Sequence, residues 1–353
     1  MTKIFGAFCL IFILSGCTSS LLVSLVAIPS SNHLTREHYE EKYRLYDTQY
    51  NQSVTFREHR IPREMHTLYA REFGDQTGEE KPVIIIMHGF PDSLHIYDRL
   101  APLLANRYRV ISFDFLGWGR SDKPKNHTYN TDSLYQDLEA VIGYFNFVNV
   151  SLVVHDASGP PGIDWALNNP EKMETLILLN TFYHPMDDLL KPEAIATFST
   201  PGFKRTFIRT AANISNYGWK IGYQNQLSKF FYDDEQRDIM MPVLTHQAMD
   251  VRNAFFQLNN VLDKEASQRS DNKQRLSDYK GKVKIIFGNE DPYLNSRVAL
   301  EFNRMLENSS MFSIDKAAHF VQLDKPKEVA NIILDSNISI LLNDNNTNLS
   351  TAQ

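Results

Sequence analysis

The 353-residue chain has only two cysteines, Cys9 and Cys17, and both lie near its N-terminus. The rest of the chain can therefore form neither a disulfide within itself nor a cysteine-based metal site. The sequence also has no Gly-rich phosphate loop with its lysine, and no His/Asp/Glu cluster with metal-ligand spacing. We therefore expect no metal ion and no bound cofactor.

An excess of positive charge is also missing. Lys and Arg number 36 against 42 Asp and Glu, which gives a formal net charge of -6, and the cations are scattered along the chain. This pattern argues against nucleic acid as a partner. Hydrophobic residues make up 42% of the chain, which is ordinary for a globular protein and sufficient for a large core.

The N-terminus has the pattern of a secretory signal peptide, predicted over residues 1–16. A basic start, MTK, precedes the short apolar run IFGAFCLIFIL and then small residues. The following LSGC resembles the lipobox of bacterial lipoproteins, which implies cleavage before Cys17 and a lipid on that cysteine. The resemblance implies attachment to the bacterial cell envelope, and Thr18, which is not an acid, favours the outer membrane.

The alternative interpretation of this segment is an uncleaved membrane anchor. Apolar residues resume at 21–28, and the whole run from Ile4 to Ile28 is long enough to span a bilayer. In both cases the rest of the chain faces an envelope compartment. Residues 17–50, polar and charged from about residue 31, are predicted to be a tether that contains at most a short surface helix.

Strand-like and helix-like patterns alternate over residues 51–181 and again over 282–342. Two alternating stretches, QSVTFREHR and REMHTLYAREFG, are expected to be strands separated at Ile61-Pro62. Uninterrupted apolar runs follow, such as PVIIIM, RVISFDF, SLVVH, LILLN and VKIIFG, and these suit parallel strands buried on both faces. The alternation predicts an α/β fold with a doubly wound, mostly parallel sheet.

Between residues 182 and 281 the pattern is helical and aromatic, without buried strand-like runs. A helical segment inserted between two parts of one sheet predicts a cap domain over the carboxyl ends of the strands, where open α/β sheets bind ligands. The Asn-rich residues 343–353 are predicted to be disordered.

Three candidate catalytic residues each follow a strand-like run. Asp156 follows SLVVH, Asp291 follows KIIFG and His319 follows SMFSID. Nucleophile, acid and histidine in this order is the chain order of the α/β-hydrolase triad. Ser158 is the alternative nucleophile, although its neighbours do not form the G-x-S-x-G pattern that a serine nucleophile needs.

Five motifs in this order resemble the haloalkane dehalogenase and epoxide hydrolase branch of the α/β-hydrolase fold. They are HGFP at 88–91, DFLGWGRSDKP at 114–124, LVVHDASGP at 152–160, GNEDP at 288–292 and AAHFVQLDKP at 317–326. The resemblance implies that Asp156 is the nucleophile, Asp291 the triad acid and His319 the base. The backbone N–H groups of Phe90 and Ala157 would then form the oxyanion hole.

The resemblance implies hydrolysis at a saturated carbon of a small apolar organic substrate. The carboxylate displaces a leaving group to give an alkyl ester, and the histidine activates the water that hydrolyses it. Dehalogenases of this branch carry a tryptophan after the nucleophile, whereas this chain has Ala157, so an epoxide is favoured over a halide. Candidate donors to the epoxide oxygen are the cap residues Tyr183, Tyr217, Tyr223, Tyr232 and Trp219.

Two other function classes stay open at this point. An ester or lactone hydrolase would use Ser158, or Asp156 in an unusual way. A binding protein without catalytic activity is also compatible with the fold, because one fold hosts many functions.

Overall fold

The computed structural model describes residues 36–74 and 80–335. The predicted signal peptide, the lipobox with Cys17 and the predicted disordered tail lie outside these residues. Among the helices in the described ranges, none combines the length and the apolar character needed to cross a bilayer.

A mixed, mostly parallel sheet of eight strands forms the centre of the molecule, in the order β1-β2-β4-β3-β5-β6-β7-β8. β1 pairs antiparallel with β2 and β2 with β4, and every other pair is parallel. This confirms the predicted fold class. The strands are β1 (Arg57–Arg63), β2 (His66–Phe73), β3 (Val83–Met87), β4 (Arg109–Asp114), β5 (Val150–Asp156), β6 (Met173–Thr181), β7 (Val283–Gly288) and β8 (Ser309–Ile314).

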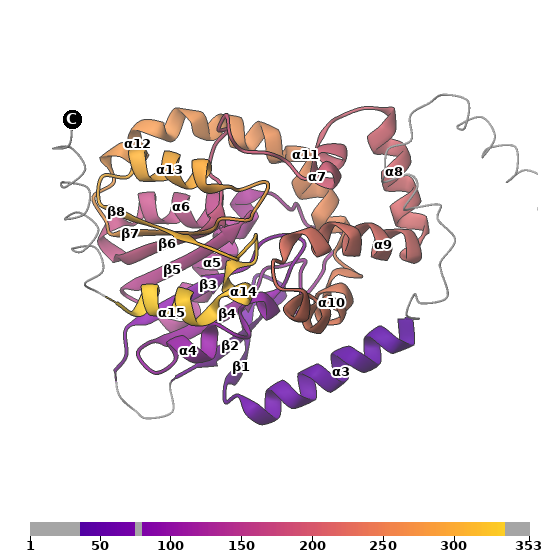
Figure 1. Ribbon diagram of the computed structural model, residues 1–353, viewed down its shortest axis with the longest axis horizontal. Helices are drawn as coiled ribbons and strands as arrows, with labels where there is room; N and C mark the ends of the chain where they lie inside the picture. The colour runs from indigo at the N-terminus through magenta and orange to yellow at the C-terminus, as the bar shows by residue number, and fades with distance from the viewer. Residues whose placement is uncertain (1–35, 75–79, 336–353) are drawn as a thin grey trace, which may run out of the picture.

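The central strands are mostly apolar because helices cover both faces of the sheet. The residues 84–87 of β3 and 152–154 of β5 are fully buried. Helices α4 (Ala101–Leu104) and α15 (Pro326–Leu334) lie together on one face. On the other face lie α5 (Thr131–Phe145), α6 (Gly159–Asn168), α12 (Lys273–Asp278) and α13 (Ser296–Met305) (Figure 1).

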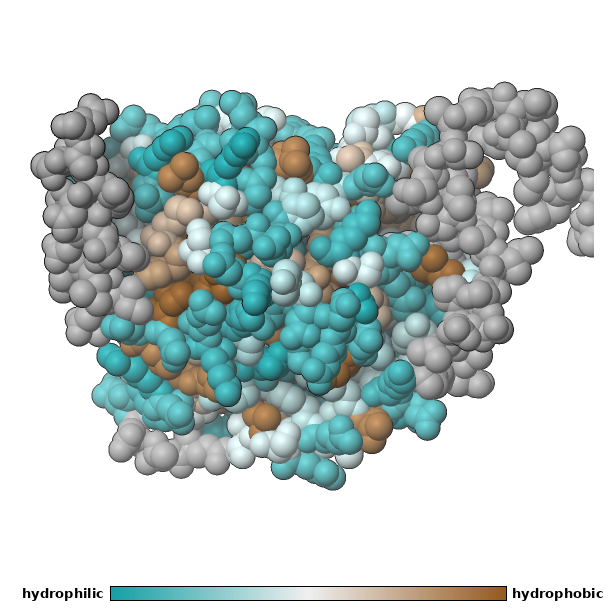
Figure 2. Space-filling model, in the orientation of Figure 1, coloured by the Kyte–Doolittle hydropathy of each residue, from teal (hydrophilic) through white to brown (hydrophobic). Residues whose placement is uncertain are grey.

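The outside of these helices is polar. Figure 2 shows a mostly hydrophilic surface in the same view, with scattered hydrophobic residues. This distribution is expected when each helix packs its apolar stripe on the sheet and turns its polar face to solvent.

Two local predictions in the core are wrong. Ile61 and Pro62 do not separate the first two strands: both lie within β1, and the chain turns at Glu64, whose φ is 56°. β1 is an edge strand, where a proline is tolerated because one side of the strand has no partner. The spacing of apolar residues in DRLAPLLANRY, residues 98–108, predicts a helix over this stretch, but the α-helix there is only the four-residue α4.

The residues between β6 and β7 form helices beyond the carboxyl ends of the strands (Figure 1). They are α7 (Glu193–Ser199), α8 (Phe203–Ile214), α9 (Asn216–Leu227), α10 (Asp234–Ala248) and α11 (Arg252–Gln268), whereas α12, just before β7, lies on the face of the sheet. The short α14 (Val321–Asp324) follows β8. Within the sheet, β3 has β4 on one side and β5 on the other, so the strand order reverses at β3. A ligand site is therefore expected at the carboxyl ends of these strands, which face the cap.

The end of the predicted tether is an 18-residue helix, α3 (Arg36–Ser53). Tyr43 stacks on His246 of α10 with ring centroids 4.1 Å apart. Asp47 accepts a hydrogen bond from the fully buried Arg71 of β2 at 3.2 Å, and Arg71 also donates to Asp98 at 3.2 Å. Helix α3 therefore contacts both the cap and the core.

Candidate active site

Asp156 lies at the sharp turn between β5 and α6. Its φ is 48°, in the left-handed region that residues other than glycine seldom adopt. The turn is tight: a Cβ added at Gly159, the first residue of α6, would lie 2.0 Å from Thr181 Oγ1. This strand-turn-helix geometry presents the Asp156 side chain at the carboxyl edge of the sheet, where nucleophiles of this kind lie.

Two backbone N–H groups hold the Asp156 carboxylate. Phe90 N donates to Oδ2 at 3.0 Å, and Ala157 N donates as well. Burial raises the pKa of Asp156, and the nearby His319 and these two N–H groups oppose the shift without cancelling it. The two predicted oxyanion donors therefore both lie on the predicted nucleophile.

His319 and Asp291 form a buried pair. His319 Nδ1 lies 2.8 Å from Asp291 Oδ2, and Asp291 also accepts from Asn180 Nδ2 at 3.0 Å and from the N–H groups of Tyr293 and Leu294 at 2.9 and 3.1 Å. Burial alone would raise the pKa of Asp291, but His319 and these donors bring it below its usual value.

The contact with Asp291 raises the pKa of His319, whereas it lowers that of Asp291. Burial alone would lower the pKa of His319, but its hydrogen bond to Asp291 brings that pKa above the usual value. The carboxylate fixes the ring through Nδ1, so Nε2 is the nitrogen available for proton transfer.

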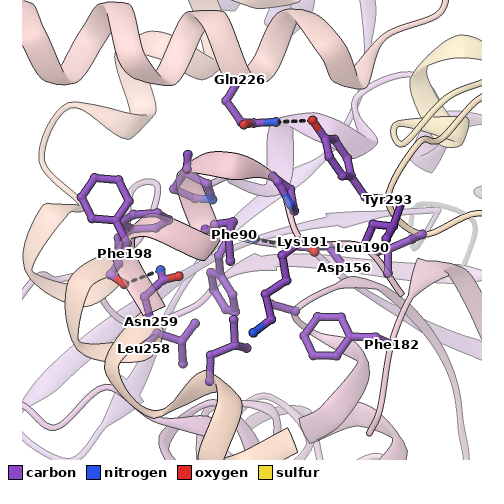
Figure 3. A pocket seen from close by; sticks show the side chains of 18 of the residues that line it. Phe90, Asp156, Phe182, Leu190, Lys191, Phe198, Gln226, Leu258, Asn259 and Tyr293 are labelled. Atoms are coloured by element: carbon purple, nitrogen blue, oxygen red, sulfur yellow. Dashed lines mark hydrogen bonds between the residues drawn. The ribbon is translucent and has the colours of Figure 1, made fainter. Parts of the chain in front are cut away.

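A pocket of about 390 Å³ lies above Asp156 and His319, which both line it (Figure 3). Most of its wall is apolar and comes from the cap: Phe198, Ile208, Trp219, Phe255 and Leu258. Several polar groups on the wall pair with one another or with the backbone. Lys191 forms an ion pair with Asp263, Gln226 donates to the Tyr293 hydroxyl at 3.3 Å, and Asn259 donates to Phe255 O at 2.8 Å.

Comparisons with known proteins show the family of the fold. A model of the alpha/beta hydrolase fold family matches residues 82–326. The chain belongs to this family.

Proteins similar to this hydrolase include an epoxide hydrolase in sequence and a haloalkane dehalogenase in fold. It is 26% identical over 268 residues to the AB hydrolase superfamily protein YfhM of Bacillus subtilis, covering 73% of this chain and 90% of that protein. It is 22% identical over 284 residues to epoxide hydrolase 3 of Xenopus tropicalis, covering 73% and 71%. A solved haloalkane dehalogenase variant from Bradyrhizobium elkanii shares the fold, with a TM-score of 0.63 at 18% identity, covering 80% of this chain and 95% of that one.

Ser158 of the hydrolase faces away from the pocket. It is fully buried, and its Oγ donates to the carbonyl oxygens of Met87 and His155 at 3.0 and 2.8 Å and accepts from His155 N at 2.8 Å. The hydroxyl thus ties the elbow to β3, and no substrate carbonyl can reach it in this position.

Two other histidines near the site are structural. His88 accepts a hydrogen bond from Phe115 N at Nε2, 3.2 Å, and its Nδ1 lies 2.6 Å from Gly89 O. His155 packs against His319 with ring centroids 4.6 Å apart. Burial lowers the pKa of both residues, so both imidazoles are neutral.

Of the five candidate cap donors, only Tyr223 and Trp219 line the pocket. Trp219 Nε1 donates to Ala248 O at 2.9 Å and is already used. Tyr183 donates to Asp164 at 2.6 Å, and Tyr232, 46% exposed, lies outside the pocket, as does Tyr217. Tyr223 is therefore the candidate whose hydroxyl is available at the site.

Three residues near the site were missed from the sequence. Tyr293 lies two residues after Asp291, and this proximity to the GNEDP motif was the signal that could have identified it. Gln226 on α9 carried no sequence signal. Asp92 directly follows the HGFP motif, is 3% exposed, and lies close enough to Asp156 for that charge to raise the pKa of Asp92. Among residues 36–74 and 80–335, no three His, Cys, Asp or Glu side chains are grouped to hold a metal ion.

Proposed function

We propose that this hydrolase opens epoxides of apolar organic molecules through a covalent ester on Asp156. The carboxylate attacks a ring carbon, the C–O bond of the ring breaks, and the oxygen takes a proton from Tyr223. His319, oriented by Asp291, then takes a proton from water, and the hydroxide attacks the carbonyl carbon of the ester. The N–H groups of Phe90 and Ala157 stabilise the resulting oxyanion.

The observation that carries this proposal is the position of the Asp156 carboxylate. It lies at the bottom of an apolar pocket, held by two backbone donors, and the His319 of a buried His–Asp pair lines the same pocket. A serine mechanism has less support because the Ser158 hydroxyl is bonded to backbone atoms away from the pocket.

The available donors favour an epoxide over a halide. A departing halide needs side-chain N–H donors, and Ala157 has none while the Trp219 N–H is bonded to the backbone. An epoxide needs a proton for its oxygen, and Tyr223 is a pocket residue whose hydroxyl has no hydrogen-bond partner among the described residues. We expect diol formation from an aryl epoxide and little halide release from a bromoalkane of similar size.

The decisive experiment is a single turnover with an aryl epoxide in ¹⁸O-labelled water, followed by mass spectrometry of the Asp156 peptide. We expect an adduct with the mass of the epoxide, and then one labelled oxygen in the Asp156 carboxylate. Asp156→Asn should abolish both signals, whereas the exposed Asp132→Asn serves as the matched control. Product formation without label in Asp156 would refute the proposal.

We also propose that the chain is attached to the cell envelope through a lipid on Cys17, with an uncleaved anchor as the alternative. The proposal is supported by the LSGC sequence and by the apolar run before it.

A further inference from the structure

We infer that the buried carboxyl of Asp92 is the proton reservoir behind Tyr223. In this inference, which rests on the proposed function, the tyrosine gives its proton to the opening epoxide and then takes a proton from Asp92. Asp92 exchanges protons only with Tyr223 and Asp156, not with the substrate, and is therefore a positioning residue.

The surroundings of Asp92 favour a protonated carboxyl. Its backbone N–H donates to Gly89 O at 3.3 Å, and the residue is only 3% exposed. Four titratable groups lie close enough to interact with it electrostatically: Asp156 of β5, His319 after β8, Tyr223 of α9 and Tyr97 of the 3-10 turn Leu94–Tyr97. A buried carboxylate is costly without a cation to pair with, and more so beside a second carboxylate.

The physical consequence is a carboxyl that titrates near neutrality. Burial, and next the charge of Asp156, raise the pKa of Asp92 to about 7, while His319 and Tyr223 act in the opposite direction. Two neighbouring buried carboxyls of this kind share one proton, because both cannot be ionised at low cost. Asp156 is the member with backbone N–H donors, so it is the one that ionises.

Tyr223 is placed between this reservoir and the substrate. It is 8% exposed and lines the pocket. Its hydroxyl lies near enough to the Asp92 carboxyl for each group to act on the other's pKa. No residue in the described part of the chain is within normal hydrogen-bonding geometry of this hydroxyl. Burial and the charge of Asp92 raise the pKa of Tyr223 well above its usual value. A tyrosinate is therefore costly here unless its proton is replaced at once.

Every proton is accounted for over one turnover. Before reaction Asp156 is ionised and Asp92 holds the proton. Ring opening gives the ester and one hydroxyl group of the product, and the proton of that hydroxyl comes from Tyr223 and is replaced from Asp92.

Hydrolysis of the ester then consumes one water. Its hydroxide forms the new C–O bond to the ester carbonyl, the bond to the alkyl oxygen breaks, and that oxygen takes the proton held by His319. Asp156 is left as the neutral acid and passes its proton back to the Asp92 carboxylate. Epoxide plus water has become diol, and both carboxyls are in their starting states.

This cycle has a signature in the pH dependence of the first step. A group with a pKa of about 7 holds its proton below that pH and loses it above. Formation of the adduct on Asp156 should therefore slow by up to about tenfold per pH unit above pH 7. Hydrolysis of the adduct should not slow over that range, because its base, His319, must be neutral.

The test measures the two steps separately by rapid quench and mass spectrometry of wild type, Asp92→Asn, Tyr223→Phe and the double variant, from pH 6 to 9. Asparagine keeps the size of the side chain and can still hydrogen bond, but it has no acidic proton. In Asp92→Asn we expect adduct formation to fall about tenfold to a thousandfold and its slope above pH 7 to vanish, while adduct hydrolysis changes by less than about threefold. The double variant should form the adduct no more slowly than Tyr223→Phe, because both substitutions interrupt the same proton transfer from Asp92 through Tyr223.

Three results would overturn the inference: a wild-type adduct rate that does not fall above pH 7, an equal loss in both steps in Asp92→Asn, or additive losses in the double variant. The wild-type profile needs no variant, so a poorly folded Asp92→Asn leaves the test valid. If wild type forms no adduct on Asp156, the proposed function itself fails, which is a distinguishable outcome.

Discussion

Replacing His319 by glutamine should separate the two chemical steps of the proposed reaction. The first step needs the Asp156 carboxylate, which keeps its donors Phe90 N and Ala157 N in the variant. The second step needs a base that glutamine cannot supply. A positioned general base contributes about 10²–10⁴-fold, which corresponds to about 3–5 kcal/mol of barrier.

The first step should change much less, by under about tenfold. His319 lowers the pKa of Asp156, so without the histidine that pKa rises further and the ionised fraction of Asp156 falls at low pH. The adduct should therefore still form near pH 7 but then persist. Nearly every enzyme molecule should carry the epoxide mass on the Asp156 peptide after mixing.

The assay follows the mass of the intact protein and of the Asp156 peptide over time, together with diol release. The expected trace is one equivalent of adduct and almost no diol. His66→Gln, at the start of β2 and outside the pocket, is the matched control and should turn over normally. Uniform slowing of His319→Gln without any accumulated adduct would refute His319 as the hydrolytic base.

Three further predictions follow from the contacts and the sequence. Tyr223→Phe should lower epoxide turnover about tenfold to a thousandfold, the scale of losing an oxyanion donor. Tyr183→Phe should retain full turnover, because the Tyr183 hydroxyl binds Asp164 away from the pocket. Equal losses of the two variants in steady-state assays would contradict the assignment of Tyr223. Asn180→Ala removes a buried amide that donates to Asp291 and accepts from Gly288 N, so the free energy of unfolding should fall by about 1–3 kcal/mol in urea titrations, and an unchanged midpoint would show that the amide is dispensable. Cys17→Ser should release the protein from the membrane fraction with the activity of the soluble protein unchanged; a variant that stays membrane-bound and unprocessed would instead indicate an uncleaved anchor.

The sequence determined the core of the fold because buried parallel strands leave a plain pattern. The runs that became β3, β5, β6 and β7 are mostly apolar on both faces, which is typical of strands covered by helices on both sides. The edge strand β1 was less certain, since its proline suggested a break and only the pairing with β2 shows that the strand continues through it. The positions of Asp156, Asp291 and His319 followed from the same pattern, because chain order and strand ends bring them to one edge of the sheet.

The tertiary structure alone decided which side chains face the substrate. Four cap tyrosines were equivalent in sequence, and helix packing turned Tyr223 into the pocket, bonded Tyr183 to Asp164 and left Tyr232 at the surface. Ser158 and Asp156 differ by two residues, yet one hydroxyl is bonded inward to β3 while the carboxylate faces the pocket. Such choices depend on contacts between residues far apart in the chain, and a local pattern of hydrophobic and polar residues does not contain them. The protonated state inferred for Asp92 has the same origin, because it arises from burial beside Asp156, 64 positions further along the sequence.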